Sequence, residues 1–457
     1  MSYQDLHDED EVLFRPIYQT SRTFYVVVIA LAAVFLFGLG CYIHQLFYGL
    51  GATGMDEPVS WAFYIVDFVF FIGISHAGTL ISAILRLSKA EWRRPITRMA
   101  EVITGIVLAI GGLHPIIDLG RPDRILHLFE RGRLQSPLLW DLTSVTAYFT
   151  ASTIYLYVPM IPDIALLRDR GGKLQNFYRI LAWGYKGTPR QKHALERAIN
   201  ILMVMVIPIA VSVHTIIAWI FGMTLQPGWH STIFGPYFVV GAIYSGIAAL
   251  VIVMVTFRKI FHFEDYLKEI HFRYLGTLLL VVALLWTYFT FAEYLTTFYG
   301  HEPAEMRVFL YKFIGAYAPF FWAMVFCNFL LPIVILSNKK TKTIPGILVA
   351  SIGVVIGMWL ERLIHNEAVC VSLTWLAMIT RCTNHHVTPI ASNQLNESVM
   401  SWMVKTFLSL MSLPLISLLL PTLQRRLHLS VRAGNPAAAW RLHVCCAPAL
   451  LWSPRSK

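Results

Sequence analysis

Residues 111–141 have the sequence GGLHPIIDLGRPDRILHLFERGRLQSPLLWD and join two apolar stretches of the chain. The first stretch ends with His114 and Asp118, and the second begins at Asp141. The connection between them is rich in arginine and acidic residues. Charged groups are costly in a membrane and are retained there mainly for function. We therefore interpret this segment as part of a redox site at one membrane face.

The composition is that of a membrane protein. Of 457 residues, 56% are hydrophobic and 14% are charged, with a mean hydropathy of +0.60. A soluble domain carries about 25% charged residues. The chain is therefore predicted to be an all-α polytopic protein embedded in a lipid bilayer. Its net charge of +11 is assigned to basic loops rather than to nucleic-acid binding.

Ten transmembrane helices are predicted from the apolar segments, because one crossing takes about 20 apolar residues. Their approximate positions are residues 24–48, 59–87, 96–118, 138–162, 195–222, 234–257, 271–298, 309–336, 343–366 and 399–421.

The basic residues predict the orientation of these helices. With ten spans both termini lie on one side, together with the tail 1–23 and the basic loop 163–194. The positive-inside rule places that side in the cytoplasm. The loop 119–137 is the exception, since it places four arginines, beginning with Arg121, on the outer face. It is interpreted either as a docking segment for another subunit or as an amphipathic surface helix.

The intramembrane ionisable residues are unevenly distributed. Because successive spans alternate in direction, nearly all of them fall in the outer half of the membrane, whereas His76 lies near the middle. Polar residues that only satisfy local hydrogen bonds would show no such bias. The pattern predicts a polar pocket that opens outward, with His76 at its inner end. The outer group comprises Asp67, His114, Asp118, Asp141, His214, Glu293, Glu361 and Arg362.

His114 and Asp118 are four residues apart and share one helix face. A carboxylate beside an imidazole fixes its tautomer and supports a proton acceptor near neutral pH. The alternative is a helix-end pair satisfied by interfacial water. Asp141 begins the next helix, where a capping role is as reasonable as proton transfer.

His76 lies in GISHAGTLIS, where small residues such as Gly73 permit tight helix packing. A single histidine there is more often bonded across helices than catalytic. Asp67 is nine residues earlier, on nearly the opposite face, and is not a same-helix partner of His76. Glu293 lies among aromatic residues, where it either binds a phenolic head group or makes structural hydrogen bonds.

Several long phrases resemble the NrfD/PsrC family of membrane quinone-binding subunits. The resemblance covers about residues 20–365 and is closest to ActC and its paralogue ActF, ten-helix subunits of alternative complex III. The matching phrases include GISHAGTLISAILRL, HPIIDLGRPDRI, GWHSTIFGPYFVVGAIYSG, FAEYLTTFYG and GMWLERL.

This resemblance implies two four-helix bundles side by side, at residues 24–162 and 195–336, followed by a ninth helix at 337–366. It implies a site for quinol, either menaquinol or ubiquinol, near the outer face of the first bundle and below an iron–sulfur protein subunit. A paralogous NrfD-like membrane subunit and cytochrome c subunits are the other implied partners, and the implied location is a bacterial inner membrane. The six cysteines include no CxxC pairs and no CxxCH motif, so the chain itself is expected to hold neither haem nor cluster.

In the leading hypothesis the chain oxidises quinol within such a complex. His76 or His114 accepts a proton, and Asp118, Asp141 or Asp67 passes it outward. Phe68, Phe70, Phe71 and Trp140 are candidates for lining the quinol ring, and for these aromatic side chains the alternative is lipid contact or core packing. Gly73 and Glu293 are further candidates for contact with quinol, and Arg121 and Arg124 are candidates for contact with the partner subunit.

Other functions fit parts of the same pattern. They are the anchor of another NrfD-type reductase, a proton-translocating bundle without quinone chemistry, and a purely structural anchor. Conduction would need polar residues from mid-membrane to the cytoplasm, and the first bundle shows few beyond Ser75, Thr79, Ser82 and Thr104.

The family phrasing stops after GMWLERLIH, which ends at His365. Residues 367–457 are predicted to form a divergent tail with the tenth helix at 399–421. We interpret this change as an aberrant reading frame or a lineage-specific replacement.

Overall fold

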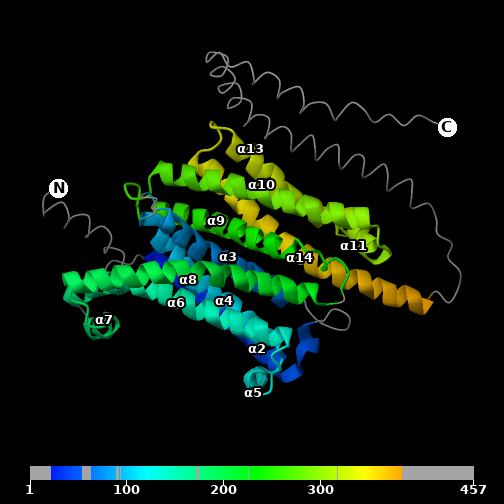
Figure 1. The fold of residues 1–457 in the computed structure, drawn as a ribbon, viewed down its shortest axis with the longest axis horizontal. Helices are drawn as coiled ribbons and strands as arrows, with labels where there is room; N and C mark the ends of the chain where they lie inside the picture. The colour runs from blue at the N-terminus through cyan, green and yellow to red at the C-terminus, as the bar shows by residue number, and fades with distance from the viewer. Residues whose placement is uncertain are drawn as a thin grey trace, which may run out of the picture. The chain divides into compact units, whose positions relative to one another are not determined.

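The computed structural model describes residues 22–53, 63–88, 92, 94–170, 174–224, 226–315 and 317–382. Every regular element in these ranges is a helix (Figure 1), which confirms the all-α prediction. Nine helical segments within them are long and apolar enough to cross a membrane. The chain is therefore a multi-span membrane protein. The predicted tenth span and the divergent tail around it lie outside the described residues.

The membrane-spanning segments are connected by short helices. The long segments are α2 (Arg22–Tyr48), α3 (Phe63–Leu87), α4 (Arg94–Asp118), α6 (Pro137–Arg170), α8 (Pro189–Gly222), α9 (Phe234–Ile260), α10 (Glu269–Gly300), the continuous run of α12 (Ala318–Val325), η4 (Phe326–Leu330) and α13 (Leu331–Ser337), and α14 (Ile344–Cys382). The short helices are η1 (Leu50–Thr53), η3 (Pro122–Arg124), α5 (His127–Glu130), α7 (Gln175–Leu181) and α11 (Pro303–Phe313).

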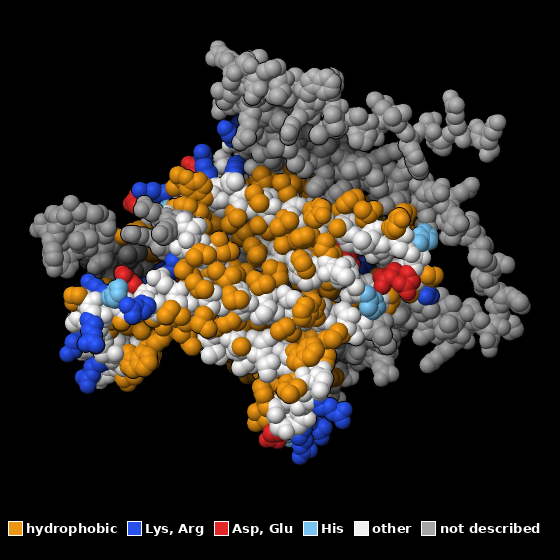
Figure 2. All heavy atoms as spheres, viewed as in Figure 1, with side chains coloured by type: hydrophobic (Ala, Val, Ile, Leu, Met, Phe, Trp, Pro, Cys, Tyr) orange, Lys and Arg blue, Asp and Glu red, His pale blue; other side chains and the backbone are white. Residues whose placement is uncertain are grey.

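The surface has the pattern that a bilayer requires. In Figure 2 apolar side chains cover the middle of the described surface, while lysine and arginine gather at its margins, around α7 and α5. Apolar side chains lose nothing by facing lipid, whereas charged ones must reach water or head groups.

The eighth predicted span, 309–336, begins later than expected. The structure has a separate helix α11 that ends at Phe313, and a new helix that begins at Ala318. Gly315 lies in the break, where its N–H donates to the carbonyl oxygen of Leu310 and a Cβ would collide with Tyr311. Pro319 then starts α12, because its fixed φ suits the first turn of a helix. Apolar composition alone did not reveal this break.

The spanning helices pack in two groups of four within the described residues. Helices α3, α4, α6 and α8 form the first group, and α9, α10, the α12–α13 run and α14 form the second; α3 packs against both. The implied first bundle, 24–162, included α2, but the apolar window of α2 is 0% buried and α8 takes its place. A helix that is apolar on all sides can remain against lipid. Hydropathy alone does not distinguish such a helix from one that packs inside a bundle.

Two glycines bring α3 and α4 into close contact beside the site. A Cβ at Gly78 of α3 would collide with the carbonyl oxygen of Ala100 and with Thr104. A Cβ at Gly111 of α4 would lie 3.2 Å from the Cβ of Phe71. Small residues at such positions let the backbones of membrane helices approach closely. The α3–α4 pair is therefore a tightly packed support for the residues at the end of α4.

Candidate functional site

A cavity of about 800 Å³ lies where α4 ends and α6 begins. Its walls come from all four helices of the first group and from the connection that contains α5. Most lining side chains are apolar, including Phe68, Phe149 and Phe221. Ligand cavities typically have volumes of about 300–1,000 Å³ and few polar groups on apolar walls. The cavity therefore has the size and character of a site for an apolar ring compound.

The polar lining contains three residues singled out in the sequence. His114 and Asp118 face the cavity from the end of α4, and Asp141 faces it from the first turns of α6. Tyr64, Arg124 and Thr146 complete the polar lining. The structure therefore brings together groups from two successive helices and the connection between them. Imidazole and carboxylate side chains around one space can accept protons from a bound hydroxyl compound.

The hydrogen bond of His114 defines its tautomer. Its Nδ1 lies 2.9 Å from the carbonyl oxygen of Ile110, which can only accept, so Nδ1 carries the proton. In neutral His114, Nε2 is then the acceptor. The ring of Phe71 lies with its centroid 5.5 Å from that of His114. Phe71 thus supports the orientation of the imidazole on the cavity wall.

Asp141 has an unsatisfied carboxylate oxygen. Its Oδ1 is buried and makes no hydrogen bond within the described residues. Buried polar atoms are nearly always bonded, so such an atom indicates a water or ligand that completes it. Asp141 therefore has a carboxylate oxygen available for a polar group in the cavity.

The α4 end of the cavity is secured by α2. Gln45 is buried and donates from Nε2 to the carbonyl oxygen of Ile117 at 3.0 Å. Its Oε1 accepts a hydrogen bond from the Tyr64 hydroxyl at 2.5 Å. Gly120 follows α4 with φ of +63°, a left-handed conformation that favours glycine, and turns the chain toward η3. These contacts position His114 and Asp118 at the cavity.

His76 lies deeper along α3 and is not part of the cavity lining. It is buried, and its Nδ1 donates to the carbonyl oxygen of Ile72 at 2.6 Å. Its Nε2 lies 3.1 Å from Nδ1 of His214 on α8, and its ring stacks on Tyr148 of α6 with centroids 4.3 Å apart. Because Nδ1 of His76 carries a proton, its Nε2 accepts from His214 when both rings are neutral. His76 therefore bonds across helices.

Asp67 and Gly73 face the second group of helices. Trp359 of α14 donates from Nε1 to Asp67 Oδ1 at 2.9 Å. A Cβ at Gly73 would lie 3.5 Å from Ser245 Oγ on α9. Both residues therefore lie at the packing surface between α3 and the second group.

Trp140 and Arg121 make contacts within the connection. Trp140 donates from Nε1 to the carbonyl oxygen of Leu134 at 2.5 Å. Arg121 is exposed and lies 3.3 Å from Asp123, and this hydrogen bond lowers the pKa of the Asp123 carboxyl. Arg124, the other arginine expected to contact a partner subunit, lines the cavity.

Glu293 lies on α10 in the second group. It is buried, and it lines a small space with Tyr294, Lys312 and His365. Lys312 belongs to α11 outside the spanning segments, and burial lowers its pKa to about 8 although Glu293 and neighbouring acids oppose the shift. These residues form a separate polar cluster on the second group.

Sequence reasoning selected Phe68, which lines the cavity, but it did not select Tyr64 or Gln45 for the site. Nothing in their local pattern distinguishes them from lipid-facing residues, since each is placed by contacts between distant helices. Within the described residues, no group of three or more His, Cys, Asp or Glu side chains could hold a metal ion.

The fold and the cavity together define a polytopic membrane protein with a largely apolar cavity at one end of its first helix group. The chain belongs to the NrfD family: the family model "Polysulphide reductase, NrfD" matches residues 51–372.

Three relatives show where such chains occur. A protein of Halobacterium salinarum, provisionally named as a membrane subunit of dimethyl sulfoxide reductase, is 27% identical over 360 residues, covering 78% of this chain and 79% of its own. A subunit of the selenate reductase of Mesobacillus selenatarsenatis is 27% identical, covering 68% and 74%. The Hdr-like menaquinol oxidoreductase integral membrane subunit of Archaeoglobus fulgidus is 24% identical, covering 72% and 75%. All three names describe a subunit of a larger oxidoreductase.

Proposed function

We propose that this chain is the quinol-binding membrane subunit of a respiratory oxidoreductase complex, with the quinol ring in the cavity between α4 and α6. The observation that carries the proposal is the meeting of His114, Asp118 and Asp141 around an apolar space of about 800 Å³. Membership of the NrfD family and a relative named as a menaquinol oxidoreductase subunit support it.

The cavity residues have distinct roles in this proposal. A bound quinol supplies two electrons and two protons. Neutral His114 accepts one proton at Nε2, and Asp118 stabilises the resulting imidazolium from the same helix face. Asp141 accepts the second proton through its unpartnered Oδ1. Phe68 and Phe149 hold the ring away from water.

A second, apolar space offers room for the isoprenoid tail of the quinol. A groove of about 500 Å³ runs along α6 and α8, and Thr146 lines both this groove and the cavity. The hydroxyl of Thr146 donates to the carbonyl oxygen of Leu142, so its methyl group is left for apolar contact. The groove therefore extends the site toward lipid, where the tail originates.

Electrons pass to an iron–sulfur partner in this proposal. The connection with Arg121, Arg124, Arg131 and Arg133 lies at the mouth of the cavity and provides a basic docking surface on the periplasmic side. In the finer form of the proposal the complex is of the alternative complex III type, with a paralogous membrane subunit and cytochrome c subunits. The names of two relatives favour a reductase complex instead. Subunit and cofactor analysis of the purified native complex distinguishes the two.

The test is quinol-dependent reduction of the partner in the purified complex. His114→Ala and Asp141→Asn are each expected to slow this reduction by about 10²-fold or more, since general acid–base groups contribute about 10²–10⁴-fold. Asp169→Asn is the matched control, because Asp169 lies at the other end of α6 in an exposed pair with Arg168. The proposal is wrong if both cavity variants retain the rate of the control.

A further inference from the structure

A surface groove of about 540 Å³ lies on the first half of α8, at the end of this helix away from the quinol cavity. Its lining residues recur at intervals of three and four, so they share one helix face. Toward the start of α8 the groove is lined by His193, Glu196, Arg197 and Asn200. It continues over the exposed side chains of Ile201, Val204 and Met205. A polar end followed by an apolar stretch is the order of groups along a phospholipid.

The short helix α7 marks the level of the lipid head groups near this groove. Ala182, directly after α7, is 0% exposed and packs on α6. Ile180 and Trp183 are nevertheless 78% and 81% exposed. Trp183 has φ of +46°, a left-handed conformation that bulky residues rarely adopt and that often accompanies function. Tryptophan is enriched where a membrane meets water, so this exposed indole places the segment at the head-group layer.

Hydrogen bonds hold the beginning of α8 at the same level. Gln191 in its first turn donates from Nε2 to the carbonyl oxygen of Gly184 at 3.4 Å and accepts from the Lys186 N–H at 2.9 Å. Figure 1 shows α7 beside this end of α8. Arg197 follows about 9 Å further along the helix, and no Asp, Glu, Lys or Arg comes after it on α8. The polar end of the α8 groove therefore lies where head groups give way to hydrocarbon.

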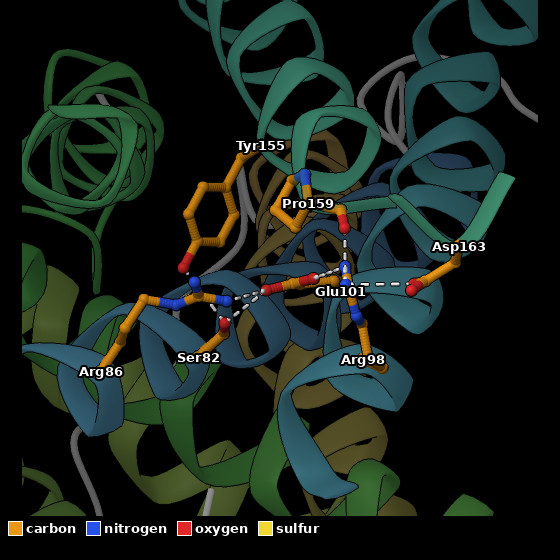
Figure 3. Close-up of polar contacts among 7 residues, drawn as sticks. All are labelled: Ser82, Arg86, Arg98, Glu101, Tyr155, Pro159 and Asp163. Atoms are coloured by element: carbon orange, nitrogen blue, oxygen red, sulfur yellow. Dashed lines mark hydrogen bonds and ion pairs between the residues drawn. The ribbon is translucent and has the colours of Figure 1, made fainter. Parts of the chain in front are cut away.

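Within the described residues, the charged side chains of the α8 groove have no ionic partner. At the same membrane face, Arg98 of α4 lies 3.1 Å from Asp163 of α6 and 3.8 Å from Glu101 (Figure 3). Neither Glu196 nor Arg197 forms such a pair in the described part of the chain. Charges at the hydrocarbon boundary must reach water or an opposite charge. Both side chains are therefore open to an ionic group of the membrane.

His193 orients the Arg197 side chain. Arg197 Nη2 lies 3.4 Å from Nε2 of His193, one turn earlier on the helix. A guanidinium group can only donate, so Nε2 of His193 is the acceptor and the other donors of Arg197 remain for a ligand. Asn200, on the same face, adds an amide group. A guanidinium presents its donors in a plane that matches phosphate oxygens. Arg197 is thus suited to bind the phosphate of a lipid.

Glu196 restricts the kind of head group. Its ionised carboxylate can only accept hydrogen bonds, and it lines the groove next to Arg197. An anionic head group would bring its negative charge against this carboxylate. A phosphate with a primary ammonium offers an opposite charge to each side chain and N–H donors to Glu196. The trimethylated ammonium of choline has the charge but no N–H. The two side chains therefore favour an ethanolamine-type head group.

We propose that the α8 groove binds an aminophospholipid. Its phosphate binds Arg197, its ammonium binds Glu196, and an acyl chain lies over Ile201, Val204 and Met205. Met205 also lines the apolar groove between α6 and α8, so the bound chain lies next to that groove. The proposal is independent of the assignment of quinol, because none of these residues lines the quinol cavity.

The test measures retention of single phospholipids by the complete complex in detergent, followed by native mass spectrometry at increasing lipid concentration. Phosphatidylethanolamine, phosphatidylglycerol and phosphatidylcholine with identical oleoyl chains are compared. The wild type is expected to bind one copy of the ethanolamine lipid about tenfold more tightly than either of the others. Arg197→Gln should lower this affinity about tenfold, because a charge-assisted bond to phosphate is lost. Glu196→Gln should remove the preference for ethanolamine over choline.

The matched control is Arg190→Gln, since Arg190 is exposed on the same helix outside the groove. It is expected to retain wild-type affinity and preference. Glycerophosphoethanolamine, which has the head group without chains, is expected not to displace the lipid.

A photoreactive ethanolamine lipid with a diazirine in its acyl chain places the lipid on the wild type without any substitution. It is expected to label residues 201–205. Equal binding of the three lipids, a preference for phosphatidylglycerol or phosphatidylcholine, or displacement by the chainless head group would refute the proposal. Wild-type affinity in Arg197→Gln, an unchanged preference in Glu196→Gln, or labelling that misses residues 201–205 would also refute it.

Discussion

The adjacent glycines of α4 should respond in opposite ways to the same small substitution. A Cβ at Gly112 meets nothing within 4 Å, because this residue faces the cavity. A Cβ at Gly111 would lie 3.1–3.2 Å from Phe71 and Ile72 of α3. One methyl group therefore tests whether the cavity and the α3–α4 contact lie where the structure places them.

The magnitudes follow from these contacts. Replacing a helical glycine by alanine stabilises by about 0.5–1 kcal/mol where space is free. Gly112→Ala should therefore raise the free energy of unfolding by about that amount. For Gly111→Ala the same gain is opposed by overpacking, which costs about 1–3 kcal/mol. The net effect should be a loss of about 0–2.5 kcal/mol.

The assay is thermal inactivation of the purified complex, followed by loss of quinone-analogue binding. Gly112→Leu tests binding as well as stability, because a larger side chain at this position enters the cavity. It should weaken analogue binding at least tenfold without lowering the inactivation temperature. Equal shifts for Gly111→Ala and Gly112→Ala, or full binding by Gly112→Leu, would refute the placement of the cavity.

Two further results are expected. In the folded protein burial lowers the pKa of Lys312 from 10.5 to about 8, so between these pH values the unfolded chain binds more protons and the free energy of unfolding should rise with pH. Denaturation of the complex is measured at pH 7.5 and at pH 10. The same measurement on Lys312→Met shows whether the rise depends on this side chain. His76→Ala removes the stacking partner of Tyr148 and leaves the Nδ1–H of His214 without an acceptor, so it should lower the free energy of unfolding by about 2–4 kcal/mol. An unchanged inactivation temperature would contradict this contact.

Much of the fold and part of the site could be predicted because both depend on residues that are close to one another in the sequence. Apolar length defined most spans to within a few residues. Spacing placed His114 and Asp118 on one helix face, and the short connection to the next helix placed Asp141 at the same membrane edge. Local geometry was enough for these three residues, which the structure finds on one cavity.

Other features depend on how helices rotate and choose neighbours. Asp67 is bonded by Trp359, 292 residues later in the chain, and no periodicity indicates that choice. His76 meets His214 because α3 and α8 pack together, which required the exclusion of α2 from the first group. The buried tyrosines of α6, Tyr148 and Tyr155, are indistinguishable in sequence from aromatic residues that face lipid. Tertiary packing, rather than composition, decides each case.

The attachment of α2 through Gln45 affects how a ligand dissolved in the bilayer could reach the protein. This helix exposes its apolar length to lipid, yet its buried amide binds both Tyr64 and the last turn of α4. Breaking these two hydrogen bonds would free α2 from Tyr64 and from the last turn of α4, and Tyr64 and the last turn of α4 belong to the cavity wall. A membrane-dissolved substrate could then be exchanged sideways, without a route through water.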